Sequence, residues 1–334
     1  MIVVTGGAGF IGSNLVAALN KREAPGIVVA DWFGDGDKWR NIAKHEVADI
    51  VPPDDLVRFL INRARRDDNW GRVEAVVHLG ANSSTTETDV DAILAQNTAY
   101  SARLWRLCTE YRIRLIYASS AATYGNGSAG FEDFDTPAEL ATLAPLNAYG
   151  WSKHLFDQRV ARWASAPETR PPQWAGLKFF NVYGPNEYHK GAMQSVVAQK
   201  YPLVRDDQPV TLFRSHNPDY ADGGQLRDFI HVDDCVAVIL WLLDHPQVNG
   251  LFNVGTGEAR SFLDLARALH AACDKPENIA YIDTPAAIRE QYQYFTQATV
   301  ARLRRAGYAA PFTSLEDGIA DYVQNYLATN DWYR

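Results

Sequence analysis

The stretch Met1–Gly12 constrains the fold of this chain more than any other. An apolar run, Ile2–Val4, leads directly into several glycines, and a segment compatible with a helix, 13–20, follows. The glycines fit two overlapping spacings, G-x-G-x-x-G and G-x-x-G-x-x-G, through Gly6, Gly7, Gly9 and Gly12. In such a strand, turn and helix, glycines permit the turn, let the backbone approach a pyrophosphate, and let the helix pack on the strand. Because N–H groups at a helix start also attract anions, the stretch predicts a dinucleotide-binding turn.

Length and segment order indicate a protein of two parts. The 334 residues are more than one ordinary hydrophobic core needs. Strand-like and helix-like segments alternate from residue 1 to about 180, which predicts an α/β fold with a Rossmann-like, doubly wound parallel sheet. We expect residues 1–180 to form a dinucleotide-binding domain, with the chain returning to it at about 228–255. Residues 181–227 and 256–334 then form a smaller α/β substrate-binding domain.

Composition argues against several classes of function. The formal net charge is -8 at pH 7, whereas a nucleic-acid partner needs a basic face. No apolar run reaches the roughly 18 residues of a membrane-spanning helix, and we expect no leader peptide before the first strand. The three cysteines, Cys108, Cys235 and Cys273, form neither a disulfide framework nor a zinc pattern, and the histidines show no metal-binding spacing. We therefore expect a cytoplasmic protein that binds no metal.

Asp31 stands where a dinucleotide-binding domain places its ribose-binding carboxylate. It follows the predicted strand Gly26–Ala30, about 20 residues beyond the glycine turn. Alone, Asp31 favours NAD, because its negative charge repels the 2′-phosphate of NADP. Lys38 and Arg40 follow closely and can attract that phosphate. The residues by themselves therefore leave the choice between NAD and NADP open.

Tyr149 and Lys153 carry the strongest signal for catalysis. They are four residues apart at the start of a predicted helix, so their side chains share one face. A free tyrosine has a pKa of about 10, and a nearby ammonium or an oxidised nicotinamide lowers this pKa, so that the phenol can act as an acid and base. Ser120, at the end of a predicted strand, can hold a substrate oxygen by a hydrogen bond. Downstream of a dinucleotide-binding turn, these three residues predict a catalytic site.

The chain resembles the extended short-chain dehydrogenase/reductases that act on nucleotide sugars. The motifs that carry this resemblance are the glycine turn, Ser119–Gly125 and Tyr149-x-x-x-Lys153. Within that family, further stretches are similar to the branch that epimerises ADP-linked heptoses, namely His78–Glu87, Phe180–Gly191 and Tyr292–Ala298. The Ser-Ser-Thr-Thr-Glu run in the first of these stretches is the most specific feature. The resemblance extends from residue 1 to about 327.

The resemblance implies an isomerase that inverts C6 of an ADP-heptose by transient oxidation to a 6-ketone. Such a reaction needs an acid or base on each face of the ketone, and the resemblance assigns these roles to Tyr149 and Lys190. Lys153 then binds the nicotinamide ribose and tunes Tyr149, while Ser120 contacts the substrate. The family also implies a tightly bound NADP, with NAD as the alternative, a homo-oligomer (a pentamer), and a role in synthesis of the lipopolysaccharide inner core.

The resemblance also places the binding residues. Its cofactor positions are Gly6, Gly9, Phe10, Ile11, Gly12, Asp31, Trp32, Lys38, Leu79, Gly80, Ala81, Asn82, Ser83, Gln96, Asn97, Lys153, Val182 and Lys190. Its substrate positions are Ser120, Asn181, Ala192, Gln199, Phe213, Arg214, Ser215, His216, Arg227 and Tyr292. Among these, Arg227 suits a diphosphate, because a guanidinium can donate to two oxygens at once.

Some residues depart from the family's pattern. Trp32 replaces a common asparagine and can stack on adenine, while Gly34 and Pro53 replace basic residues that help to hold the 2′-phosphate, so that Lys38 remains for this role. On the substrate side, Ala192 replaces a serine and Gln199 a histidine. The loop 215–226 is longer than usual. These departures leave the chemistry intact and bear on the identity of the nucleotide and sugar.

Two other functions fit part of the pattern. Another nucleotide-sugar epimerase of the same fold, such as a UDP-hexose 4-epimerase, shares Ser120, Tyr149 and Lys153, and differs at Lys190 and in the substrate domain. A sugar dehydratase needs a carboxylic acid where this chain has Ala121-Ala122. A non-catalytic dinucleotide-binding sensor, which is a different class of function, would not need the tyrosine and lysine pair.

Overall fold

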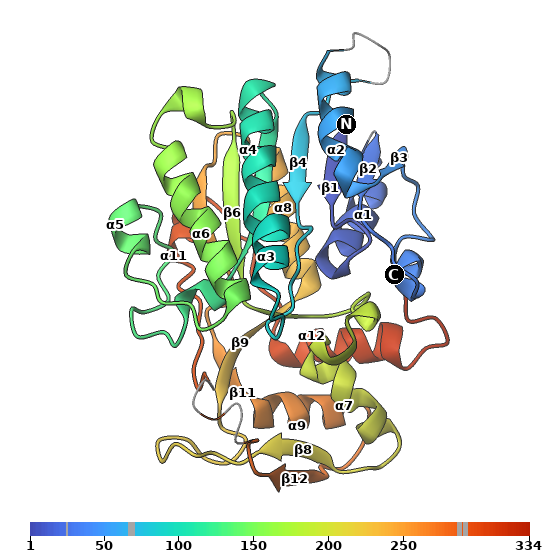
Figure 1. The fold of residues 1–334 in the computed structure, drawn as a ribbon. Helices are drawn as coiled ribbons and strands as arrows, with labels where there is room; N and C mark the ends of the chain where they lie inside the picture. The colour runs from blue at the N-terminus through green and yellow to red at the C-terminus, as the bar shows by residue number, and fades with distance from the viewer. Residues whose placement is uncertain (25, 66–70, 286–288, 290–292) are drawn as a thin grey trace.

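A seven-stranded parallel sheet forms the larger part of the molecule (Figure 1). The computed structural model describes residues 1–334 except 25, 66–70, 286–288 and 290–292. The strand order is β10-β6-β5-β4-β1-β2-β3, and every pairing is parallel. The predicted doubly wound parallel sheet is therefore confirmed. Its strands are β1 (Ile2–Thr5), β2 (Ile27–Ala30), β3 (Asp49–Val51), β4 (Ala75–His78), β5 (Arg114–Ser120), β6 (Trp174–Phe179) and β10 (Gly250–Val254).

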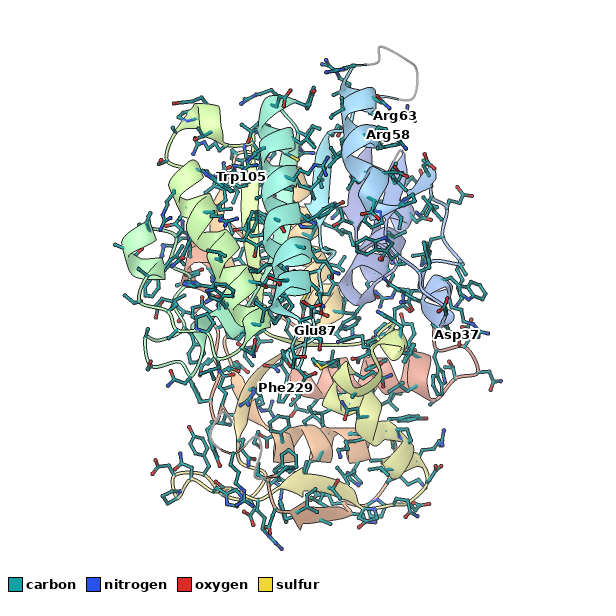
Figure 2. The ribbon with its side chains drawn as sticks, viewed as in Figure 1. Asp37, Arg58, Arg63, Glu87, Trp105 and Phe229 are labelled. Atoms are coloured by element: carbon teal, nitrogen blue, oxygen red, sulfur yellow. The ribbon has the colours of Figure 1, made fainter. Side chains whose placement is uncertain are left out.

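Helices cover both faces of this sheet, because alternate strand residues point to opposite sides. Val3 of β1 belongs to a hydrophobic cluster with α2 (Pro53–Ala64), α4 (Tyr100–Glu110) and α6 (Ala148–Trp163). Its neighbour Val4 belongs to a second cluster with α1 (Phe10–Lys21) and α8 (Val232–Asp244). In the first cluster, Trp105 of α4 is 1% exposed and donates its indole N–H to the carbonyl oxygen of Thr169 at 2.9 Å (Figure 2).

A smaller lobe lies below the carboxyl ends of the main strands in Figure 1. A three-stranded sheet has the order β11-β9-β7, and a two-stranded sheet pairs β12 with β8. Phe229 of β9 packs in the hydrophobic cluster of this lobe, with its ring 5.5 Å from that of Phe262 (Figure 2). The elements of the lobe are β7 (Asn181–Tyr183), α7 (Val196–Arg205), β8 (Val210–Phe213), β9 (Leu226–His231), β11 (Ala259–Ser261), α9 (Phe262–Ala272), β12 (Ile279–Ile282) and α12 (Leu315–Tyr322).

The chain crosses between the two parts more than once. β9 pairs with β7 and β11 in the small sheet, whereas α8, which follows it directly, packs beside α1, and β10 then pairs with β6 at the edge of the main sheet. In the described residues, no helix has the length and apolarity needed to span a membrane. The remaining short elements are η1 (Asp37–Asn41), α3 (Val90–Ile93), η2 (Leu94–Ala99), η3 (Ala121–Tyr124), α5 (Pro137–Leu140), η4 (Pro167–Thr169), η5 (Tyr188–Met193), α11 (Ala301–Arg305) and η6 (Val323–Leu327).

Candidate active site

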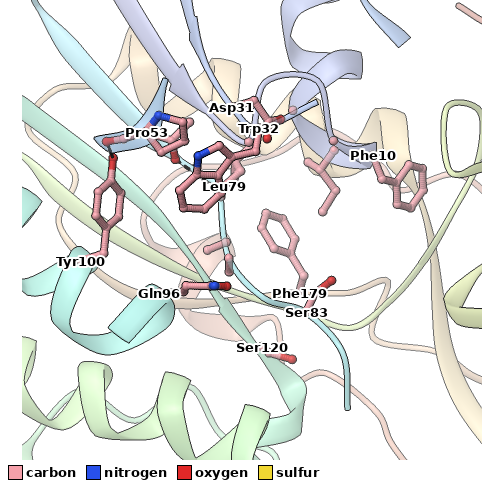
Figure 3. A pocket seen from close by; sticks show the side chains of 18 of the residues that line it. Phe10, Asp31, Trp32, Pro53, Leu79, Ser83, Gln96, Tyr100, Ser120 and Phe179 are labelled. Atoms are coloured by element: carbon pink, nitrogen blue, oxygen red, sulfur yellow. Dashed lines mark hydrogen bonds between the residues drawn. The ribbon is translucent and has the colours of Figure 1, made fainter. Parts of the chain in front are cut away.

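A cavity of about 550 Å³ lies at the carboxyl ends of the main strands (Figure 3). Residues at the ends of β1, β2, β4, β5 and β6 line it, together with the start of α1. β1 has β2 on one side and β4 on the other, so the strand order reverses beside it. Open α/β sheets bind their ligands at such a switch point, outside the carboxyl ends of the strands.

The glycine turn has the shape that a dinucleotide needs. Gly6 has φ +65°, and a Cβ on Gly12 would lie 2.0 Å from the carbonyl oxygen of Gly6. Gly9 is the N-cap of α1 and has no side chain that could cap the helix. N–H groups at this helix start are therefore available to an anion. Gly6, Gly9 and Gly12 line the cavity. A Cβ on Gly7 would instead meet the side chain of Val29, so Gly7 serves packing on β2, and Gly6 makes the turn.

Asp31 and Lys38 form an ion pair where the adenosine ribose is expected. The Lys38 ammonium donates to Oδ1 of Asp31 at 2.6 Å and to the carbonyl oxygen of Trp32 at 2.8 Å. Oδ2 of Asp31 accepts the N–H of Ala8 at 2.9 Å, which fixes the carboxylate beside the glycine turn. The two side chains neutralise each other, and both line the cavity.

Trp32, Pro53 and Tyr100 border the same end of the cavity (Figure 3). Trp32 is 52% exposed, which leaves its indole free to cover a flat ring. Tyr100 donates its hydroxyl to the carbonyl oxygen of Pro53 at 2.9 Å, and thereby ties the start of α4 to the start of α2. The sequence analysis did not identify Tyr100, because nothing in the local pattern distinguishes it from a packing residue.

Ser120, Tyr149 and Lys153 meet at the opposite part of the cavity. Asn147 caps α6 by accepting the N–H of Gly150, which starts the helix just before Tyr149. Burial raises the pKa of the Tyr149 phenol, and its hydrogen bond with Ser120 lowers it. Burial also lowers the pKa of Lys153 to about 8, while its ammonium donates to the carbonyl oxygen of Ala118 at 2.9 Å. The phenol is therefore held in contact with the serine that is expected to bind the substrate.

A buried ion pair lies next to this part of the site and does not line the cavity. Lys178 of β6 and Asp157 of α6 both have side chains of 0% exposure, with Nζ 2.8 Å from Oδ2. Ser119 donates its hydroxyl to the same carboxylate at 2.7 Å. Because Ser119 directly precedes Ser120, and Asp157 lies one turn after Lys153, the pair fixes β5 against α6.

Lys190 lines the cavity from η5, whereas Tyr149 lines it from α6. Its ammonium lies 3.8 Å from Oε2 of Glu187 and 4.8 Å from the centre of the Phe10 ring. Burial lowers the pKa of Lys190, and the Glu187 carboxylate raises it. Glu187 is itself fully buried and accepts the N–H and the hydroxyl of Ser195. The structure thus brings a second titratable group into the cavity, held by a carboxylate that does not line it.

Three buried asparagines join this segment to the glycine turn. Asn14 donates to the carbonyl oxygens of Phe10 and Pro185, each at 2.9 Å. Asn186 donates to the hydroxyl of Ser13 at 3.1 Å and to the carbonyl oxygen of Asn41 at 3.2 Å. Asn41 in turn donates to the carbonyl oxygen of Ala8 at 2.8 Å and lies 3.1 Å from Nδ1 of His189. The segment that precedes Lys190 is therefore tied to the wall that carries the glycines.

A second cavity of about 310 Å³ adjoins the first, since Ser120, Tyr149, Phe179 and Phe180 line both. Asn181 lines it, as expected for a substrate residue, and so do Thr85 and Gln293 from the stretches that carry the resemblance. Gln293 donates its amide to the carbonyl oxygen of Gly125 at 2.6 Å, and so it closes one side. Both residues lie in stretches that carry the resemblance, and this is the signal in the sequence that points to them.

The structure brings most of the predicted cofactor residues together. Those that line the larger cavity are Gly6, Gly9, Phe10, Ile11, Gly12, Asp31, Trp32, Lys38, Leu79, Gly80, Ala81, Ser83, Gln96, Lys153, Val182 and Lys190. Asn82 and Asn97 do not line it. Asn97 is fully buried, accepts the N–H of Asn82 and donates to the hydroxyl of Ser152 on α6. It lies in the π-helical turn η2, which directs Gln96 toward the cavity and Asn97 into the core.

Most of the predicted substrate residues lie outside both cavities. Arg214 pairs with Asp222 and Asp283 in the distal part of the small lobe, and Phe213, Ser215 and His216 adjoin it in the chain. Gln199 donates to the carbonyl oxygen of Ala192, so the two departures from the family pattern contact each other. Arg227 lies on β9 with its guanidinium over the Phe262 ring. Tyr292 lies outside the described residues.

Comparisons with known proteins show the family of this chain. Residues 2–255 match the family described as the NAD dependent epimerase/dehydratase family. The chain is 50% identical over 331 residues to the ADP-L-glycero-D-manno-heptose-6-epimerase of Nitratidesulfovibrio vulgaris, covering 99% of each chain. It is 46% identical over 339 residues to the protein of the same name from Fusobacterium nucleatum, covering 100% of each. The crystal structure of Helicobacter pylori ADP-L-glycero-D-manno-heptose-6-epimerase is similar with a TM-score of 0.78 and 27% identity, covering 97% of this chain and 95% of that chain.

Proposed function

Because this chain belongs to the NAD dependent epimerase/dehydratase family, we propose that it inverts C6 of the heptose in ADP-D-glycero-D-manno-heptose. The product is ADP-L-glycero-D-manno-heptose, and no net oxidation or reduction occurs. One observation carries the proposal: Tyr149 from α6 and Lys190 from η5 line the same cavity. Two acid/base groups on separate elements suit a reaction in which the C6 hydroxyl loses its proton as hydride leaves one face of C6, and the ketone oxygen gains a proton as hydride returns to the other face. The names of the relatives support the choice of sugar.

A nicotinamide dinucleotide fits the larger cavity. The positive φ of Gly6 and the close approach of Gly12 to Gly6 form a cradle that side chains would fill. We propose that Asp31 binds the adenosine ribose and that Lys38 holds the 2′-phosphate of NADP, with NAD as the alternative. Trp32 covers the adenine and Lys153 the nicotinamide ribose. A nicotinamide bound there would supply the hydride acceptor for the oxidation at C6 and the hydride donor for the reduction that follows.

The residues of this chain then move the proton of the C6 hydroxyl. Ser120 donates a hydrogen bond to that oxygen, and the Tyr149 phenolate takes its proton while the C–H bond breaks. The Lys153 ammonium and the positive nicotinamide favour the phenolate. After the ketone presents its other face, the Lys190 ammonium donates a proton to the ketone oxygen as the C–H bond forms. Two groups are needed because one side chain cannot reach both faces without moving.

We propose that the two parts of the chain bind different ligands. Residues 1–180 and the returning segment at about 228–255 hold the cofactor, while residues 181–227 and 256–334 hold the nucleotide sugar. The second cavity, with Thr85, Asn181 and Gln293, supports a heptose site beside Ser120. The resemblance supports a cytoplasmic homo-oligomer that serves synthesis of the lipopolysaccharide inner core.

Proton NMR tests the proposal. The purified protein is incubated with ADP-D-glycero-D-manno-heptose and no added cofactor, and the anomeric and C6 signals are followed. Appearance of the L-glycero isomer supports both the reaction and a retained cofactor. An unchanged sugar, even with NADP or NAD supplied, contradicts the heptose assignment. Conversion of a UDP- or GDP-hexose in parallel tubes would then identify another nucleotide-sugar epimerase.

A further inference from the structure

Residues 331–334 run from the small lobe to the wall of the cofactor cavity. In Figure 1 the C-terminus lies beside the blue segment near the start of the chain, beyond the end of α12. The proposed mechanism assigns no part to these residues. They nevertheless make polar contacts with three separate segments, and two of those segments hold residues of the site.

The first contact is with the stretch that follows Lys38. The Lys44 ammonium lies 2.6 Å from Oδ2 of Asp331 and donates to the carbonyl oxygen of Tyr333 at 2.5 Å. The guanidinium of Arg40 lies 5.9 Å from the centre of the Tyr333 ring. Asp331 and Tyr333 are therefore attached to the segment that carries the proposed 2′-phosphate ligand.

The second contact is with the segment that carries Lys190. Tyr188 donates its hydroxyl to the carbonyl oxygen of Trp332 at 2.8 Å, and its ring centre lies 5.6 Å from that of Trp332 and 5.4 Å from that of Tyr333. The backbone N–H of Arg334 donates to Oδ1 of Asn186 at 2.9 Å. Asn186 has φ 71° and is fully buried, so its uncommon backbone conformation depends on such contacts.

The third contact anchors the segment to α8. The Arg334 guanidinium donates to both carboxylate oxygens of Asp233, and its Nε donates to the hydroxyl of Tyr326 at 3.0 Å. His231 and Asp321 adjoin Asp233, and the three form a group of the kind that can hold a metal ion. Here Arg334 supplies the positive charge to that group. A bidentate arginine and carboxylate pair fixes orientation as well as position.

We propose that residues 331–334 form a clasp that positions the Lys190 segment over the cofactor cavity, with Arg334 as its positioning residue. The clasp closes a chain of contacts from Asp233 through Arg334 and Asn186 to the glycine turn. This inference rests on the proposed function in one respect, since Lys190 is taken as the second acid/base. Without the clasp, the segment between Asn186 and Lys190 keeps its covalent links but loses its outer support.

The variant Arg334→Met tests the clasp, with Arg260→Met as the matched control. Arg260 makes an equivalent two-bonded pair with Glu316 in the small lobe, away from both cavities. Arg334→Met loses the bonds of the guanidinium to Asp233 and Tyr326. We expect its kcat to fall about tenfold and its retained cofactor to dissociate about tenfold faster, with KM changed little. Arg334→Lys restores part of both values, because it keeps the charge. Arg260→Met changes neither.

Equal kcat and equal cofactor dissociation in Arg334→Met and Arg260→Met would overturn the clasp. If Arg334→Met does not fold, Tyr188→Phe removes the hydroxyl that donates to the carbonyl oxygen of Trp332 and leaves the ring in place, and the same two measurements apply to it. Cofactor dissociation is measured by fluorescence on the purified holoenzyme and needs no sugar. If Arg334→Met releases cofactor about tenfold faster than wild type, but the wild-type protein converts no heptose, the proposed function is refuted and the clasp is still supported.

Discussion

The ammonium nitrogen of Lys190 lies 3.8 Å from Oε2 of Glu187, a carboxylate with no exposed surface. Burial lowers the pKa of Lys190 and the Glu187 carboxylate opposes this effect, so Glu187 favours the charged form of the lysine. Lys190 must be charged in order to donate a proton to the ketone oxygen. Glu187 does not line the cavity, and it acts on the reaction through Lys190.

Replacing Glu187 by glutamine lowers the pKa of Lys190, because the opposite charge is lost. We expect the alkaline limb of the kcat profile to move to lower pH by about one unit, the size of effect of a nearby charge. Glutamine retains an oxygen that can accept from Ser195. The measurement is kcat against pH for both proteins. An alkaline limb at the same pH in both would show that Glu187 does not set the state of Lys190.

Tyr149→Phe removes the proposed base while leaving the ring in place. We expect kcat to fall by about 10²–10⁴, the usual contribution of a positioned acid or base, with the bound cofactor unchanged. The measurements are the rate of heptose conversion and the cofactor content of the purified protein. Tyr111→Phe, at the end of α4 and outside both cavities, is the matched control and keeps its rate. Retention of most of the activity in Tyr149→Phe would rule out this role.

Gly12→Ala places a methyl group where the glycine turn has no room. Its Cβ would lie 2.0 Å from the carbonyl oxygen of Gly6, and backbone cannot yield as a flexible side chain can. We expect the protein to purify without cofactor or to unfold at a lower temperature than wild type. Gly36→Ala is the control, because no atom lies within 4 Å of its added Cβ. Full cofactor content and an unchanged melting temperature in Gly12→Ala would contradict the geometry of the turn.

Lys38→Met tests the choice between the two dinucleotides. Lys38 is the cation paired with Asp31, and its loss leaves a bare carboxylate facing the 2′-phosphate. We expect the Kd for NADP to rise at least tenfold, while the Kd for NAD changes less, since about 1.4 kcal/mol corresponds to tenfold. Titration of cofactor-free protein with each dinucleotide measures both. An equal loss of affinity for NAD and NADP would mean that Lys38 supports the site but does not bind the 2′-phosphate.

His78 makes stability depend on pH. It is buried between Thr5 and Ser101, with its ring nitrogens 2.6 Å and 2.8 Å from their hydroxyl oxygens, and burial lowers its pKa to about 3. The unfolded chain protonates this histidine near pH 6.5 and the folded protein does not, so stability is present above pH 6.5 and falls toward pH 3. From pH 7.5 to pH 5 this amounts to about 2 kcal/mol of unfolding free energy.

Urea unfolding at pH 7.5 and pH 5 measures this dependence. His78→Gln removes the titrating ring, so we expect the difference between the two pH values to shrink by about 2 kcal/mol. His216→Gln, at an exposed loop position, keeps the wild-type difference. The same pH dependence in wild type and His78→Gln would assign the effect to other groups.

The cofactor half of the molecule could be predicted because its signals are local in sequence. A buried strand, a glycine turn and a helix follow one another within Met1–Lys21, and Asp31 follows the next strand. The spacing alone could not decide whether Gly6 or Gly7 makes the turn, since both fit a known pattern. The backbone decides it, because only Gly6 has a positive φ.

The substrate half was harder to predict because distant segments build it. Thr85, Asn181 and Gln293 line one cavity although some 100 residues separate each from the next. The resemblance also places substrate at Arg214 and its neighbours, which line neither cavity, and this assignment stays a prediction. Nor does any local pattern reveal the contacts of residues 331–334, since Arg334 meets Asp233 only in the folded chain.

The most direct test of the central claim is the reaction run in D₂O. If C6 is inverted by transient oxidation, its hydrogen leaves as hydride and returns to the same carbon without meeting solvent. NMR and mass spectrometry of the product should then find ADP-L-glycero-D-manno-heptose with ordinary hydrogen at C6. Deuterium at C6 would indicate inversion by exchange of a proton with solvent and would contradict the account, as would the absence of the L-glycero isomer.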